Sequence, residues 1–284
     1  MFVGPSLWTI LLSWKFGVFV VLAAIGAALL ITGRLRRWSR AAVLAAAFFL
    51  LGGVVVLLAP GLDKFLGMHP SPMCALTRIA EFWVAKGLLP KMLLATLGVI
   101  LLLSLVGKKL FCGWACPLGA LQELLYLLPG VKKIPNLPFR FTNLVRTYLL
   151  VFYLVGVFAV GINIYDHVNA FELMHWELTF GGAVLGIGLV ALGGLFYYRP
   201  YCYLVCPIGL VSWAVERFSY LAVRLDKGKC TGCKLCLAKS PCPAIAPIVE
   251  GRTGWLPDCT SCGLCLETCP EKALSFRGPK GGDA

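Results

Sequence analysis

The sequence has few charged residues, and this scarcity limits the classes of protein that it can encode. Only 14% of its 284 residues are charged, and 59% are hydrophobic, whereas a soluble domain is about 45–50% apolar. The apolar excess lies in long uncharged runs, which are typical of membrane-spanning helices. The composition therefore argues against an ordinary soluble protein and indicates an integral membrane protein with a smaller water-exposed part.

Acidic residues are especially scarce, so the net charge is +13. A basic balance can indicate nucleic-acid binding, but no basic patch with interleaved aromatic residues appears in the water-exposed part. Lys and Arg instead gather between the apolar runs, as they do in the cytoplasmic loops of membrane proteins. We therefore expect contacts with membrane lipid and no nucleic-acid partner.

Five apolar runs are long enough to predict transmembrane helices. They are residues 14–33, 41–60, 90–107, 146–164 and 179–198. The basic cluster Arg34–Arg40 follows the first run instead of preceding it, so this run is a retained span and not a signal peptide. Basic residues gather in alternate loops, among them Arg140 and Arg146 in the loop before the fourth run. The positive-inside rule then predicts a multi-pass protein of the bacterial inner membrane, with its N-terminus outside and its C-terminus in the cytoplasm.

An internal repeat relates two parts of the apolar region. Cys112 and Cys116-Pro117 recur as Cys202 and Cys206-Pro207, 90 residues further on. Each copy is predicted to be a helical hairpin that ends in Cys-x3-Cys-Pro on the cytoplasmic side, and paired hairpins often place a shared site at their interface. Three interpretations of the four cysteines remain open: ligands of a further metal centre, redox dithiols, or small buried residues.

Eight of the 13 cysteines lie in residues 225–284, at iron–sulfur spacing. The strongest signal is the bacterial ferredoxin run C-x2-C-x2-C-x3-C-P, which spans Cys259–Pro270. A second run, Cys230–Pro243, has two extra residues before its last cysteine. Zinc sites usually carry two ligand pairs with a longer gap between them. We therefore expect two 4Fe–4S clusters in a small α+β dicluster ferredoxin-like domain, residues 225–284, after an α-helical membrane domain with two hairpin repeats, residues 1–224.

The order of the two runs predicts crossed ligation, because the cysteine before each proline ligates the other cluster. One cluster is expected on Cys230, Cys233, Cys236 and Cys269. The other is expected on Cys259, Cys262, Cys265 and Cys242, of which Cys242 is the least constrained because of the insertion. Thiolate ligands need a reducing compartment, which also places this domain in the cytoplasm. Cys74 lies across the predicted membrane from the others and is not expected to be a ligand.

All three histidines fall in the two outward loops, near acidic residues. This pattern suggests a quinol site, in which histidines and carboxylates accept protons. The candidates are His69, Asp166, His167, Glu172 and His175. The alternative interpretation is that these are ordinary interfacial residues, and a bis-histidine haem has no motif to support it.

The two Cys-x3-Cys-Pro segments also carry a resemblance to a known family. They read Gly107-Lys-Lys-Leu-Phe-Cys112-Gly-Trp-Ala-Cys116-Pro-Leu-Gly-Ala-Leu-Gln-Glu123 and Tyr201-Cys202-Tyr-Leu-Val-Cys206-Pro-Ile-Gly. Over about residues 41–275 the chain resembles the polyferredoxin-like membrane family that includes NapH, MauN and the C-terminal half of NosR. The resemblance implies a quinol dehydrogenase or electron-transfer subunit with two 4Fe–4S clusters, serving a respiratory or periplasmic oxidoreductase system through a ferredoxin-type or cytochrome partner.

Two departures from the family are visible. NapH-like proteins usually have four spans, whereas five are predicted here, and the flavin-binding domain of NosR-like proteins has no counterpart. A second hypothesis is a cupric reductase, or a maturation factor for a partner redox enzyme, because cysteine pairs at a membrane edge suit metal handling. A third is a membrane anchor with structural or sensory clusters. Metal content and quinone-dependent oxidation would separate these hypotheses.

Overall fold

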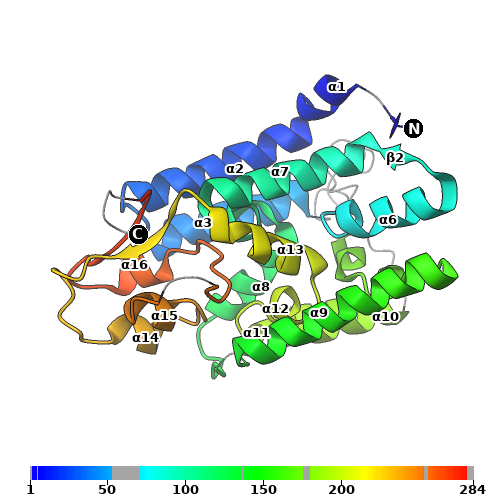
Figure 1. The fold of residues 1–284 in the computed structure, drawn as a ribbon. Helices are drawn as coiled ribbons and strands as arrows, with labels where there is room; N and C mark the ends of the chain where they lie inside the picture. The colour runs from blue at the N-terminus through cyan, green and yellow to red at the C-terminus, as the bar shows by residue number, and fades with distance from the viewer. Residues whose placement is uncertain are drawn as a thin grey trace.

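The computed structural model describes residues 2–4, 6–52, 71–135, 137–174, 180–252 and 255–279. Its main body consists of long apolar helices that run roughly alongside one another (Figure 1). These are α2 (Trp14–Ile31), α3 (Arg37–Leu51), α7 (Lys91–Gly107) and α9 (Phe139–Val155), which continues as a π-helical turn (Gly156–Val160). A further helical stretch consists of α10 (Phe180–Ala183), a π-helix (Val184–Leu192) and α11 (Gly193–Phe196).

Two of the described helices, Trp14–Ile31 and Phe139–Val160, are long and apolar enough to cross a membrane. Lys91–Gly107 and Phe180–Phe196 are shorter apolar helices. The predicted span at 41–60 begins as α3, and its second half lies outside the described residues. Membrane association thus has structural support, while five complete crossings stay a prediction.

The fourth predicted span begins earlier than expected. The helix starts at Phe139, directly after Pro138, so the prediction that Arg140 and Arg146 lie in a loop was wrong. Arg146 is fully buried and forms an ion pair with Asp258, 112 residues further along the chain. A buried arginine is tolerated when such a partner neutralises it, and the local sequence does not reveal the partner.

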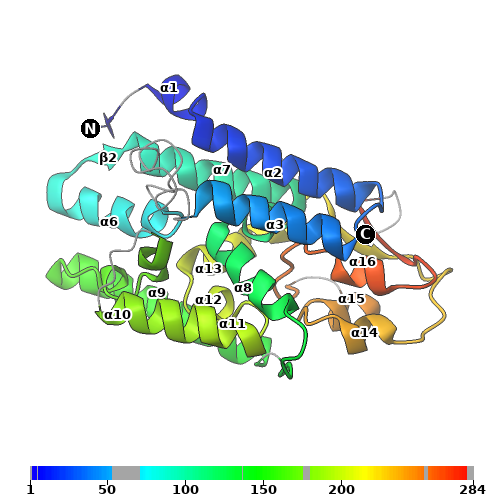
Figure 2. The same ribbon diagram turned by 180° about the vertical axis from the view of Figure 1, so that it is seen from behind.

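Short helices lie between two groups of long helices, one made of α2, α3 and α7 and the other of α9 and the stretch from α10 to α11 (Figures 1 and 2). They are α8 (Pro117–Leu127), α12 (Pro200–Leu204) and α13 (Pro207–Val215). Both α8 and α13 begin with the proline of a Cys-x3-Cys-Pro motif, where the missing N–H and fixed φ of proline favour a helix start. The first turns of α8 and α13 are buried; α8 packs against α3, and α13 packs against α7 and α9.

The C-terminal domain lies at one end of the helical body (Figure 2). Its β3 (Ala222–Leu225) pairs with β4 (Leu274–Arg277) in an antiparallel ribbon, with Val223 opposite Phe276. Three short helices complete it: α14 (Leu235–Lys239), α15 (Ile245–Val249) and α16 (Leu264–Thr268). The strand starts three residues before the expected boundary at residue 225, and β4 also contacts α2.

The opposite end carries α6 (Cys74–Lys86) and the N-terminal α1 (Leu7–Leu11) (Figure 1). A short parallel pair joins β1 (Phe2–Val3) to β2 (Leu89–Pro90) there. Two 3-10 turns, Ile164–Asp166 and Ala170–Met174, link α9 to the stretch that begins at α10. The described candidate quinol residues, Asp166, His167 and Glu172, lie in or beside these turns.

Candidate functional site

The cysteines of one predicted cluster come together at the outer side of the C-terminal domain. A cavity of about 90 Å³ is lined by Cys230, Cys233, Cys236 and Cys269. The first three follow one another around a tight loop, in which Gly232 and Lys234 both have positive φ. Cys269 comes from the far end of the domain, after α16. The arrangement fits crossed ligation, and the exposure of Cys233 puts this distal site at the surface.

The other four cysteines form a proximal group that is buried against the helical body. Cys259, Cys262 and Cys265 are all buried, and the Cys242 side chain hydrogen-bonds to Cys259. This hydrogen bond lowers the pKa of Cys259 to about 6, although burial opposes the shift. The extra residues before Cys242 therefore do not keep it from the other three.

The two groups hold four cysteines each. The four thiolates of a 4Fe–4S cluster each bind a different iron. The two groups of four cysteines thus suit 4Fe–4S clusters, which would supply one-electron redox chemistry when bound.

The loop with the proximal cysteines is fastened to the first Cys-x3-Cys-Pro motif. The indole Nε1 of Trp114 donates to the carbonyl of Ser261 at 3.0 Å, and Ser261 Oγ donates to the carbonyl of Gly107 at 2.9 Å. At Gly113 a Cβ atom would collide with the carbonyl of Thr260. Only glycine allows the two backbones to approach this closely.

All four cysteines of the two motifs line one enclosed cavity of about 30 Å³. Asp258 and Thr260 also line it, so it lies between the helical body and the proximal loop. The repeat thus brings Cys112, Cys116, Cys202 and Cys206 to the same place. Whether they hold a centre or act as dithiols stays a prediction.

Hydrogen bonds join the two motifs, and their donors are basic residues at equivalent positions of the repeat. Lys109 Nζ donates to the carbonyl of Gly209 at 2.6 Å, and Arg199 Nη1 donates to the carbonyl of Cys112 at 2.5 Å. Each cation therefore reaches from its own motif to the other. Each also has a buried acidic partner: Asp258 for Lys109, and Glu123 for Arg199.

Glu123 is the centre of a fully buried network that joins both repeats. It pairs with Arg40 from α3 and with Arg199, and it accepts a hydrogen bond from the Tyr198 hydroxyl at 2.9 Å. Burial alone would raise the pKa of Glu123, but the two guanidiniums lower it to about 2. The carboxylate is therefore ionised at neutral pH and offsets two buried positive charges.

Sequence reasoning missed the role of Glu123 and Arg40. The signal was present: Glu123 is the one acidic residue in the apolar stretch 118–128. A lone carboxylate in such a stretch requires a buried cationic partner. Which cation it meets depends on how α3 and α11 pack against α8.

The candidate quinol residues divide between described and undescribed parts of the chain. His69 and His175 lie outside the residues that the structure describes. Asp166 forms an ion pair with Arg78 at 3.1 Å. Burial and, to a smaller extent, the nearby Glu81 raise the pKa of Asp166, although Arg78 opposes this shift. His167 is exposed and Glu172 is half-buried. Arg78 and Glu81, which come from α6, were not among the residues predicted from the sequence.

Comparison with known proteins supports an iron–sulfur assignment. A family model described as a 4Fe-4S binding domain matches residues 89–135 and 178–224, each of which contains one Cys-x3-Cys-Pro motif. The ferredoxin-type protein NapH of Escherichia coli is 31% identical over 68% of this chain and 71% of its own length. An uncharacterized protein of Methanocaldococcus jannaschii is 31% identical over 70% and 84%, respectively. No solved structure matches.

The fold, the cysteine runs and these matches define a ferredoxin-type iron–sulfur protein of electron transport. A methylamine utilization ferredoxin-type protein MauN, from Methylorubrum extorquens, is 28% identical over 66% of this chain and 67% of its own. The chain belongs to the NapH/MauN/NosR-type ferredoxin-type family. The resemblance found in the two Cys-x3-Cys-Pro segments is thereby confirmed.

Proposed function

We propose that this protein transfers electrons between the quinone pool and two 4Fe–4S clusters, on behalf of a partner oxidoreductase. The supporting observation is the order of the two cysteine groups: the proximal group is buried against the helical body, and the distal group includes the exposed Cys233. Electrons would enter or leave the membrane side at the proximal cluster. They would be exchanged with a ferredoxin-type or cytochrome partner at the distal one.

The proposed reaction balances with two one-electron clusters. A quinol that becomes a quinone releases two electrons and two protons, and each 4Fe–4S cluster accepts one electron. The protons pass to water, and the reverse direction uses the same balance. Two clusters thus match the two electrons of one quinol.

The proposal includes a location in a bacterial inner membrane, with several spans and the C-terminal domain in the cytoplasm. The apolar helices Trp14–Ile31 and Phe139–Val160 support membrane insertion. Basic residues between the apolar runs support the orientation.

The test uses full-length protein reconstituted in lipid vesicles with decylubiquinol as donor. Reduction of the clusters is followed by their absorbance and electron paramagnetic resonance spectra. We expect quinol-dependent cluster reduction, with dithionite defining the fully reduced signal. Clusters that dithionite reduces and that no quinol reduces, and no quinone reoxidises, would refute the proposal.

A second candidate function is reduction of a metal ion, such as cupric copper. It is favoured by the enclosed cavity that all four motif cysteines line. Adding Cu(II) to the dithionite-reduced protein distinguishes the two functions. Metal reduction predicts stoichiometric Cu(I) formation that disappears in Cys112→Ser, whereas quinone-linked transfer predicts none beyond slow background reaction.

A further inference from the structure

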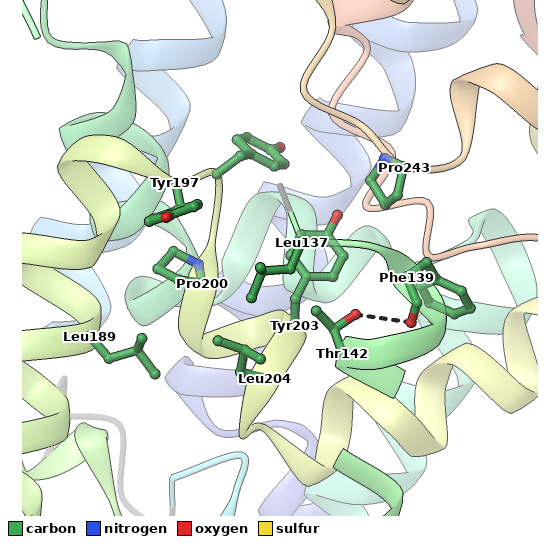
Figure 3. A pocket seen from close by; sticks show the side chains of 10 residues that line it. Leu137, Phe139, Thr142, Leu189, Tyr197, Pro200, Tyr203, Leu204 and Pro243 are labelled. Carbon is green, nitrogen blue, oxygen red and sulfur yellow. Dashed lines mark hydrogen bonds between the residues drawn. The ribbon is translucent and has the colours of Figure 1, made fainter. Parts of the chain in front are cut away.

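A third cavity lies beside the proximal cysteines and borders the buried carboxylate network through Tyr198. Its volume is about 180 Å³, and it lies where α9 and α12 meet the loop of Pro243. Its lining is almost entirely apolar and aromatic, with side chains such as Leu137, Phe139 and Leu204 (Figure 3). An engineered apolar cavity of about 150 Å³ is enough to bind benzene. The cavity therefore has room for one substituted six-membered ring.

One polar atom in this cavity lacks a partner. The Tyr203 side chain is 6% exposed, and its buried hydroxyl makes no hydrogen bond. Figure 3 shows this hydroxyl at the end of the ring nearer Pro243. Two other hydroxyls of the lining have partners: Thr142 Oγ1 donates to the carbonyl of Phe139 at 3.1 Å, and the Tyr198 hydroxyl donates to Glu123 at 2.9 Å. A buried hydroxyl that lacks a partner is destabilising, so a ligand oxygen at this position would satisfy it.

The cavity also lies next to the ligands of the proximal cluster. Pro243 directly follows Cys242, and the rings of Tyr198 and Tyr203 pack in one cluster with Cys262 and Leu264. The two tyrosine rings are 6.5 Å apart, centre to centre. A ring bound here would therefore be close to the iron–sulfur group that exchanges electrons with it.

The helix that forms one wall of the cavity also exposes apolar side chains. α9, which contributes Phe139 and Thr142, exposes Leu144, Val151 and Phe152 along its length. In a membrane these side chains would contact lipid, where an isoprenoid tail dissolves.

We infer that this cavity binds the head group of a quinone, with the Tyr203 hydroxyl hydrogen-bonded to a ring oxygen. The inference rests on the proposed function and specifies its site. The quinone ring would then lie beside the proximal cysteine group. The rival location is the group of Asp166, His167 and Glu172, in and beside the two 3-10 turns between α9 and α10.

The test is photolabelling with an azido-ubiquinone in vesicles that contain the full-length protein, followed by peptide mapping. We expect the label on residues 137–142 or 197–204 of the wild type. Tyr203→Phe should weaken binding about tenfold, which corresponds to one lost hydrogen bond. Leu204→Trp should fill the cavity and abolish labelling. Tyr148→Phe, which removes an exposed hydroxyl from α9, is the matched control and should bind normally.

Dithionite-reduced spectra of every variant show whether both clusters are intact, independently of quinone. A label on residues 163–174, with binding lost in Asp166→Asn and kept in Tyr203→Phe and Leu204→Trp, would overturn the inference and leave quinone-linked transfer standing. A wild-type protein that neither takes up the label nor reacts with decylubiquinol would overturn both.

Discussion

The guanidinium of Arg146 lies 2.8 Å from the carboxylate of Asp258 and ties helix α9 to the residue before Cys259. Lys109, from the first Cys-x3-Cys-Pro segment, pairs with the same carboxylate. All three side chains are at most 3% exposed. One acidic residue thus holds both repeats against the proximal cysteine loop.

Asp258→Asn should therefore destabilise the junction between the two domains. Removing one partner from a buried ion pair costs about 3–5 kcal/mol, because the remaining charges are left without compensation. We expect a lower denaturation midpoint and loss or broadening of the proximal cluster signal, with the distal signal kept. Glu250→Gln, which removes an exposed partner of Arg252, is the control and should change little. Equal loss of both cluster signals would contradict a role confined to the junction.

Iron analysis tests the two cysteine groups separately. Two 4Fe–4S clusters correspond to roughly eight irons per chain. Cys242→Ala should lower this to about four and leave the distal spectrum unchanged, because Cys242 contacts Cys259 and not the distal group. Cys74→Ser should keep the full content. About four irons in the wild type would mean that only one cluster forms.

The four cysteines that share one cavity should be necessary for transfer and dispensable for the ferredoxin clusters. Cys112→Ser and Cys202→Ser remove one thiol from each motif, and both thiols line the cavity between the helical body and the proximal loop. We expect normal dithionite-reduced spectra and no cluster reduction by decylubiquinol. If the double variant is reduced by quinol at the wild-type rate, these cysteines only pack the helix ends.

Glu123→Gln should strongly destabilise the helical body. The buried guanidiniums of Arg40 and Arg199 would lose their counter-charge, at a cost of about 3–5 kcal/mol. Chemical denaturation of the two proteins in detergent measures this difference. A loss below about 1 kcal/mol would show that the network contributes little.

The pH dependence of this network follows from the sign of its pKa shift. The folded pKa of Glu123 is about 2, below its ordinary value of 4.5, so its contribution to stability is complete above 4.5 and is lost as the pH falls through 2. Between about pH 5 and 8, titration of Glu123 should not change the stability difference between wild type and Glu123→Gln. A difference that declines steadily across this range would contradict the low pKa.

Reporter fusions test the proposed orientation. The basic cluster Arg34–Arg40 after the first apolar run predicts that a C-terminal fusion lies in the cytoplasm. A C-terminal alkaline phosphatase should be inactive and a fluorescent protein fluorescent in cells. The opposite pattern would place the ferredoxin-type domain outside the cytoplasm.

The sequence by itself determined the ferredoxin-type class, the repeat and the grouping of the cysteines. Cysteine spacing is local information, since a run such as Cys259–Cys265 brings its three thiols together whatever surrounds it. The apolar runs predicted helices at 14–33, 90–107 and 179–198. The structure has helices at Trp14–Ile31, Lys91–Gly107 and Phe180–Phe196. The 90-residue offset predicted that the two motifs would lie in equivalent positions.

Only the tertiary structure decided which charged side chains pair and where the cavity beside Tyr203 forms. Arg146 was expected in a loop, Glu123 had no predicted partner, and Tyr203 had no predicted role. Each acquires its role from residues more than fifty positions away: Asp258 for Arg146, Arg40 and Arg199 for Glu123. The cavity beside Tyr203 exists because α9, α12 and the loop of Pro243 converge there. Such pairings and spaces arise from the packing of helices in three dimensions, which the spacing of residues along the chain does not encode locally.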